Sequence, residues 1–234
     1  MSASSERKSW VAAVRSLAQR RDLRYEAVGG LNPRDAPAAL CPGGSNRLTG
    51  ELADGFWGAS CDALERQAGG LLGRGTVLAD GLLVKSHMPD LAAVVPRFDV
   101  ESIEAGPEEQ LRKRSSRRVK FESIEFNERF IATVPSDHDP VALRELFSPG
   151  FLTWTTTIDR EVSFGALDRQ SYFLWRLREG TGEELELALS NAGKLFARLR
   201  RELEGAGAVA HPPGPWNAGL EQFPGREPKT AEQF

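Results

Sequence analysis

The stretch that most constrains this fold is "TGEELELALSNAGKLFARLRREL", which begins at Thr181. Its opening matches a capping box, in which the side chains of Thr181 and Glu184 satisfy each other's backbone amides. Apolar residues then recur at three- and four-residue steps: Leu185, Ala188, Leu189, Ala192, Leu195, Phe196, Leu199 and Leu203. This spacing predicts a long amphipathic helix with one apolar face. The rest of the chain must therefore supply a surface, most simply a sheet, that covers this face.

The composition indicates a chain that folds on its own. Of the 234 residues, 40% are hydrophobic and 27% are charged, which is ordinary for a globular protein. The net charge of -3 provides no global field that would attract nucleic acid or an anionic membrane, so nucleic acid is a disfavoured partner. No window is long and apolar enough for a transmembrane segment, and no signal-peptide core precedes the first helix. Two cysteines, Cys41 and Cys61, are too few for a disulfide framework. We therefore expect a cytoplasmic protein.

The first half predicts one helix followed by hairpins. Residues 5–21 carry apolar side chains at helical spacing, and "LRYEAV" follows as a short strand. The Gly- and Pro-rich stretch at 29–46 reads as a surface loop. Asp54-Gly55 predicts a tight turn between strands near 47–53 and 56–62, and "TVLADGLLVKSHM" repeats the pattern around Asp80-Gly81. "VPRFDVESIE" is expected to add one more strand.

The second half predicts two more hairpins around a pair of short helices. In "FESIEFNERFIATV" the apolar alternation favours a hairpin whose tip is Asn127-Glu128, with Arg129 bridging to Glu125. Asp139 and Pro140 are typical of a helix start, and Ser148-Pro149-Gly150 is expected to end that helix and to start another. "VSFGALDRQSYFLWRLRE" predicts a hairpin around Asp168 to Gln170.

These elements predict an α+β fold. We expect a mostly antiparallel sheet built from hairpins, an N-terminal amphipathic helix, a short mid-chain helix pair and the long C-terminal helix. The predicted organisation is a helix and hairpin sheet at 1–104, a charged connection at 105–118 and a hairpin-helix-hairpin-helix unit at 119–205. The last unit is expected to pack with the first half as one domain. Residues 206–234 lose apolar periodicity and are expected to be a flexible tail.

No recognised catalytic motif occurs. The three histidines, His87, His138 and His211, are scattered, and Asp139 beside His138 is expected to cap a helix rather than bind a metal. Cys61 lacks an activating context for a nucleophile. The glycines of "GGLLGRGT" fit neither a phosphate loop nor a dinucleotide fingerprint. We expect no cofactor and no metal, and the sequence favours a non-enzymatic protein without deciding the question.

Two surface features are candidates for binding. A basic cluster could hold phosphates or an anionic surface, although a solvated connection explains it as well. Its members are Arg112, Lys113, Arg114, Arg117, Arg118 and Lys120. In the tail, Trp216 and Phe223 are large apolar residues in a Pro- and Gly-rich segment, which fits either anchors that dock on a partner or side chains that pack back onto the domain.

The motif Phe126, Asn127, Arg129 and Phe130 resembles an uncharacterised family of actinobacterial proteins. The resemblance continues through Asp137 and the helix junction at the residues Leu146, Ser148, Pro149 and Trp154, and it includes the opening helix and Tyr25. Glu128 departs from the pattern, because relatives have a basic residue there. The resemblance implies a shared fold and no activity.

The leading hypothesis from the sequence is a protein-interaction domain whose partner is another protein, with self-association left open. The first alternative is a small anionic-ligand binder or enzyme with a pocket near the 121–134 hairpin. There, Asn127 and Arg129 could bind a carboxylate or a phosphate. The second alternative is phosphate or membrane-surface binding through the 112–120 basic cluster.

Overall fold

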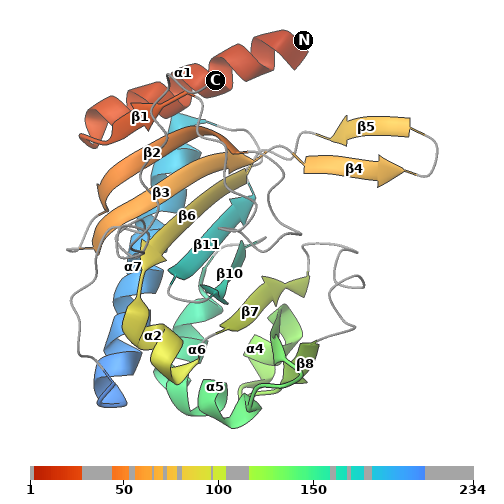
Figure 1. The fold of residues 1–234 in the computed structure, drawn as a ribbon, viewed down its shortest axis with the longest axis vertical. Helices are drawn as coiled ribbons and strands as arrows, with labels where there is room; N and C mark the ends of the chain where they lie inside the picture. Colours follow the sequence, from red (N-terminus) through yellow and green to blue (C-terminus); the bar gives the residue numbers. More distant parts are fainter. Residues whose placement is uncertain are drawn as a thin grey trace, which may run out of the picture.

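The computed structural model describes residues 3–27, 44–52, 56–64, 66–70, 73–77, 81–95, 97–103, 116–158, 162–167, 170–176 and 181–208. Within these ranges the fold is α+β, as predicted, with a mostly antiparallel sheet and a long C-terminal helix (Figure 1). The helices are α1 (Ala3–Arg20), α2 (Pro89–Val94), α4 (Ile124–Arg129), α5 (Pro140–Leu146), α6 (Pro149–Thr155) and α7 (Gly182–Gly205).

The main sheet has nine strands in the order β1-β2-β3-β6-β11-β10-β7-β9-β8. Their bounds are β1 (Arg24–Glu26), β2 (Gly44–Leu52), β3 (Phe56–Leu64), β6 (Gly81–His87), β7 (Arg97–Ser102), β8 (Ser116–Val119), β9 (Phe130–Pro135), β10 (Val162–Leu167) and β11 (Gln170–Arg176). The hairpin β10–β11 lies between β6 and β7, so strands from the two halves of the chain alternate within one sheet.

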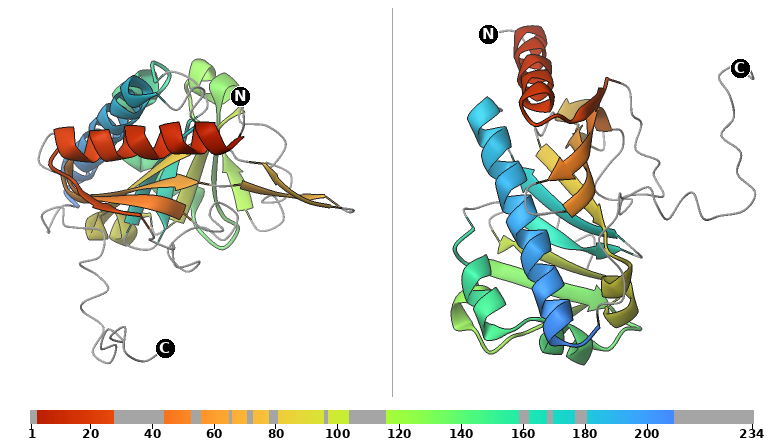
Figure 2. Two further views of the ribbon diagram at one scale, coloured as in Figure 1. Left: turned by 90° about the horizontal axis from the view of Figure 1, so that it is seen from above. Right: turned by 90° about the vertical axis from the view of Figure 1, so that its left-hand side faces the viewer.

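One face of the sheet carries the helices and the core. α7 runs along this face and α1 crosses near its start (Figure 2). The apolar residues of α7 predicted from the sequence are all buried, and they share one hydrophobic cluster with Val84, Phe98, Phe164 and Phe173 of the sheet. The N-cap is confirmed, because the Thr181 hydroxyl accepts the amide of Glu184 at 3.2 Å. The apolar face of α7 therefore packs on the sheet, as the sequence predicted.

Aromatic side chains fill the part of the core beneath β7, β9 and β10. Phe147 lies 4.5 Å from Phe151 and 5.5 Å from both Phe98 and Phe121, between ring centroids. Phe151 lies on α6 and Phe147 directly follows α5, whereas Phe98 belongs to β7. The cap predicted at Asp139 is present, since its Oδ1 accepts the amide of Val141. Ser148, at the predicted start of the second helix, caps that helix, because its Oγ accepts the amide of Phe151. The mid-chain helix pair is thus confirmed.

Several predicted strands are also confirmed. β2 and β3 pair around residues 53–55, with Leu52 opposite Phe56, and β10 and β11 pair with Leu167 opposite Gln170. β7 is the extra strand expected after residue 95.

Three of the structural predictions from the sequence are wrong. Residues 121–134 form no hairpin, because α4 occupies Ile124–Arg129 and leads directly into β9. The second N-terminal hairpin is absent too, since β5 (Gly73–Val77) pairs with β4 (Arg66–Gly70) in a separate ribbon that projects from the body (Figure 1). β6 pairs instead with β3 and β11. Finally, residues 116–118 belong to β8 rather than to a charged connection.

Candidate functional site

A cluster of exposed cationic side chains lies at the end of the sheet formed by β8. β8 pairs with β9 on one side, from Ser116 opposite Pro135 to Val119 opposite Ala132. No strand within the described ranges pairs with its other side. Arg117, Arg118 and the following Lys120 are all exposed. We call these three cations and the outer backbone of β8 the β8 edge.

The buried residue Val119 fixes how the β8 edge presents its charges. Its side chain is 1% exposed and lies in the core on the helix-covered face. Because successive side chains of a strand point to opposite faces, Arg117 shares that face and Arg118 lies on the other. The Arg117 guanidinium donates to the carbonyl oxygen of Ser136 at 3.3 Å. Beyond the strand, Arg144 of α5 donates to the carbonyl oxygen of Lys120 at 3.1 Å, which anchors the chain as it leaves the sheet.

The structure thus describes only part of the predicted basic cluster. Arg117, Arg118 and Lys120 lie together at the β8 edge, whereas Arg112, Lys113 and Arg114 lie outside the described residues.

Asn127 holds the chain segment between β8 and α4. Its side-chain oxygen accepts the amide of Phe121 at 3.1 Å. Its side-chain nitrogen donates to the carbonyl oxygens of Phe121 and Ser123 at 2.6 and 2.7 Å. Ser123 caps α4, because its hydroxyl accepts the amide of Phe126 at 3.2 Å. Asn127 therefore serves this loop rather than a hairpin tip.

Arg129 is directed toward the end of α6. Its guanidinium donates to the carbonyl oxygens of Thr156 and Ile158, which follow that helix, and it lies 5.6 Å from the ring centroid of Phe130. The expected bridge to Glu125 across a hairpin is wrong, since there is no hairpin. The two side chains do not form a common pair, and ligand binding by Asn127 and Arg129 stays a prediction.

A row of polar residues crosses the face of the sheet opposite the helices. Cross-strand register aligns Lys85 of β6 with Tyr172 of β11, then Gly165 of β10 and Asp99 of β7. Paired residues share one face. Tyr172 donates a hydrogen bond to Asp99. A Cβ on Gly165 would lie 2.9 Å from the Tyr172 ring, so the missing side chain makes room for this contact.

Sequence reasoning missed this polar row. Lys85 and Tyr172 are 2% and 3% exposed, and neither residue stood out in the sequence. The row continues through Thr133 of β9 to Arg118, so it ends at the β8 edge.

Two neighbouring side chains form a hydrogen bond in the turn before α5. His138 Nδ1 lies 3.0 Å from Asp137 Oδ1. The hydrogen bond from His138, with a smaller contribution from the Arg97 charge, lowers the pKa of the Asp137 carboxyl. Both groups lie at the surface and Asp139 is engaged as a helix cap, as predicted.

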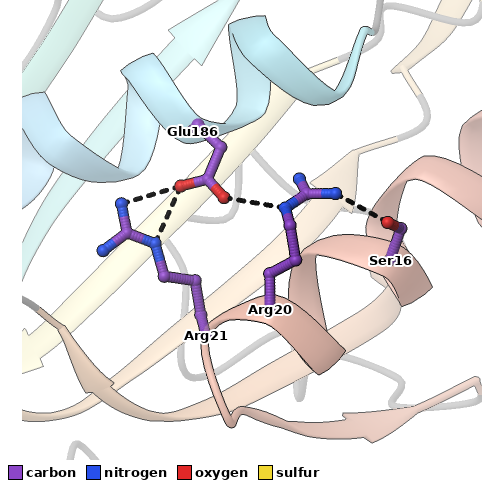
Figure 3. Close-up of polar contacts among 4 residues, drawn as sticks. All are labelled: Ser16, Arg20, Arg21 and Glu186. Carbon is purple, nitrogen blue, oxygen red and sulfur yellow. Dashed lines mark hydrogen bonds and ion pairs between the residues drawn. The ribbon is translucent and has the colours of Figure 1, made fainter.

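A cluster of polar contacts joins the two long helices (Figure 3). Glu186 of α7 accepts from Arg20 Nε at 3.2 Å and from Arg21 Nε at 2.8 Å, while Arg20 also donates to Ser16 at 2.6 Å. Such exposed pairs contribute little individually, so the cluster chiefly fixes where the end of α1 meets the start of α7.

The described residues contain no group of three or more potential metal ligands. None of the helices in these ranges has the length and apolar character needed to cross a membrane. Trp216, Phe223, Cys41 and His211 lie outside the described residues, and so do residues 209–234 of the expected tail.

No model of a known protein family matches the sequence, and no curated protein matches it either. Among solved structures, the fold is similar to the crystal structure of the mycobacterial trehalose monomycolate transport factor A, TtfA. The TM-score is 0.55 at 10% sequence identity, and the match covers 83% of this chain and 96% of that chain. At this identity the likeness is one of fold. The resemblance of the Phe126–Phe130 motif to an actinobacterial family stays a prediction.

Proposed function

We propose that this chain is a non-enzymatic accessory protein that acts by binding another protein. The observation that supports this most is the fold, which over 83% of this chain is similar to that of a protein described as a transport factor. Proteins with similar folds can have different functions, so the accessory role is our proposal. The chemistry of the surface fits this role, because the β8 edge offers exposed charge and an outer side that pairs with no strand among the described residues.

Two parts of the chain are the proposed contacts. The first is the β8 edge. The second is the segment after Ala208, in which Trp216 and Phe223 are the proposed anchors, since large aromatic residues contribute strongly to protein interfaces. We also propose a cytoplasmic location for the protein. Fractionation of the source cells tests this location.

The deciding experiment is native mass spectrometry of the full chain, purified gently from its own host, beside a version that ends at Ala208. This end point keeps the core intact, because Ala208 packs against it and its amide donates to the carbonyl oxygen of Leu203 at 2.9 Å. A co-purifying protein in a fixed ratio supports the proposal, and its loss from the shorter version assigns the contact to the tail.

A different result supports the alternative. If both versions carry the same small bound mass and no protein, the chain is a ligand binder and our proposal is wrong. Asn127 and Arg129 are then the first residues to substitute, with circular dichroism as the check that the variants fold.

A further inference from the structure

We propose that the β8 edge binds an extended acidic segment of a partner protein, which adds to the sheet as a further strand. This inference rests on the proposed function and specifies the chemistry of the partner. It follows from three properties of the edge: an outer side that pairs with no strand in the described part of the chain, the placement of its cations and the poor fit of other occupants.

The backbone of β8 can accept another strand. Its inner side pairs with β9 along its whole length, and its outer side faces no strand within the described part of the chain. An exposed edge presents amides and carbonyls in the geometry that an extended peptide matches, which is the basis of recognition by strand addition. Both ends of β8 are anchored, by the contacts of Arg117 with Ser136 and of Arg144 with Lys120. The edge is therefore already ordered before a partner arrives.

The charges specify which peptide fits. Arg117 and Arg118 are adjacent on β8, so the residues directly opposite them on an added strand are also adjacent. Opposite charges in such cross-strand positions are favourable, and like charges are unfavourable. The segment that fits best has two consecutive acidic residues, one for each face of the sheet. Lys120 adds a third cation just beyond the strand.

Other occupants fit less well. A second copy of this chain, paired antiparallel through the same edge, would place arginines near arginines. A membrane surface or a nucleic-acid backbone presents its phosphates on one side, whereas Arg117 and Arg118 lie on opposite faces of the sheet. An added strand in the plane of the sheet reaches both faces. We therefore favour an acidic peptide over these alternatives.

The test uses the full chain and a fluorescein-labelled peptide with two central glutamates flanked by threonine and valine. Fluorescence anisotropy should show binding, and a peptide with lysines in place of the glutamates should bind at least about tenfold more weakly. An N-methylated form of the glutamate peptide, which lacks the amides needed for pairing, should also lose binding.

Variants of the protein assign the binding to the β8 edge. The double variant Arg117→Glu and Arg118→Glu should lose affinity for the glutamate peptide and gain affinity for the lysine peptide. This exchange of preference requires a folded protein, so it separates recognition from unfolding. The double variant Lys194→Glu and Arg201→Glu on the exposed surface of α7 is the matched control for net charge and should leave both affinities unchanged within about twofold.

Three outcomes of the binding assays overturn the inference. The first is an absence of peptide binding. The second is equal binding of the N-methylated peptide, which would indicate charge attraction without strand addition. The third is tighter binding of anionic phospholipid vesicles or single-stranded DNA, abolished by the same double variant. A co-purifying protein that the double variant retains also rejects this edge while leaving the proposed function intact.

Discussion

Tyr172 reaches across β10 to donate a hydrogen bond to Asp99, and its ring lies over Gly165. The contact joins β11 to β7, two strands that are not neighbours in the sheet. A glycine between them is what allows an aromatic ring to span the intervening strand. The residue type at position 165 is thus set by packing within the polar row.

Gly165→Ala should destabilise the protein. A Cβ there would lie 2.2 Å from the carbonyl oxygen of Phe98 on the adjacent strand, and 2.8 Å from the Tyr172 hydroxyl. Because the first of these atoms is backbone, β7 must shift, and we expect a loss of about 3 kcal/mol in the free energy of unfolding, measured by urea denaturation. Gly150→Ala is the control, since its nearest atom lies at 3.8 Å. Equal losses in the two variants would contradict this account.

Asn127→Asp should also weaken the fold. The substitution removes both donors to the carbonyl oxygens of Phe121 and Ser123 and places a negative charge against them. We expect the free energy of unfolding at pH 7 to fall by about 2 kcal/mol. Asn191→Asp is matched to it, because the Asn191 side chain donates to Leu187 on the exposed side of α7. Its expected loss is below about 0.5 kcal/mol. A stable Asn127→Asp protein would reopen the possibility that Asn127 is held for a ligand.

The double variant Ser86→Ala and Ser171→Ala should be at least as stable as the parent protein. These serines face each other on β6 and β11, and their buried hydroxyls have no hydrogen-bond partner among the described residues. Removing such groups avoids the cost of keeping them from water, so thermal or urea unfolding should show a gain of up to about 1 kcal/mol. Thr155→Val is the contrast, because the Thr155 hydroxyl donates to Phe151 at 2.8 Å and its loss should destabilise. A loss from the serine variant equal to that of Thr155→Val would show that the hydroxyls are bonded in solution.

His138→Ala should raise the pKa of Asp137 toward its usual range. The hydrogen bond from His138 is the largest cause of the lowered pKa, so an NMR titration of the Asp137 carboxyl should move to higher pH in the variant. Since the folded pKa lies below the unfolded one, the contribution of Asp137 to stability is present above the unfolded pKa and is lost as the pH falls through the folded pKa. Arg97→Gln should produce a smaller change, because the Arg97 charge is a lesser cause. A larger change in Arg97→Gln than in His138→Ala would reverse this ranking.

Local signals account for the parts of the fold that the sequence predicted. The capping residues Thr181, Asp139 and Ser148 each act within a few residues of their own position, and the apolar stripe of α7 is a property of one helix. The prediction of a hairpin at 121–134 was wrong for a local reason as well. Phe126 and Phe130 are four residues apart, a spacing that fits the repeat of a strand and also that of a helix. Ser123, three residues before Phe126, was the available sign of a helix start.

The polar row could not be predicted in the same way. Tyr172 and Asp99 are 73 residues apart in the sequence, and they meet only because of the register of β10 against its two neighbours. The same holds for the β8 edge, because the sequence marks the cations but not the strand order that leaves β8 outermost. The contact between Glu186 and Arg20, which are separated by 166 residues, could not be predicted for the same reason.

The insertion of β10 and β11 between β6 and β7 has a consequence for synthesis of the chain. When β6 and β7 leave the ribosome, the strands that will join them have not yet been made, so the long-range pairing that completes the sheet is delayed. Leu82 and Val84 of β6 are buried in the finished sheet, and we expect them to be exposed during that interval. We therefore expect the nascent first half to depend on chaperones until residues 162–176 emerge.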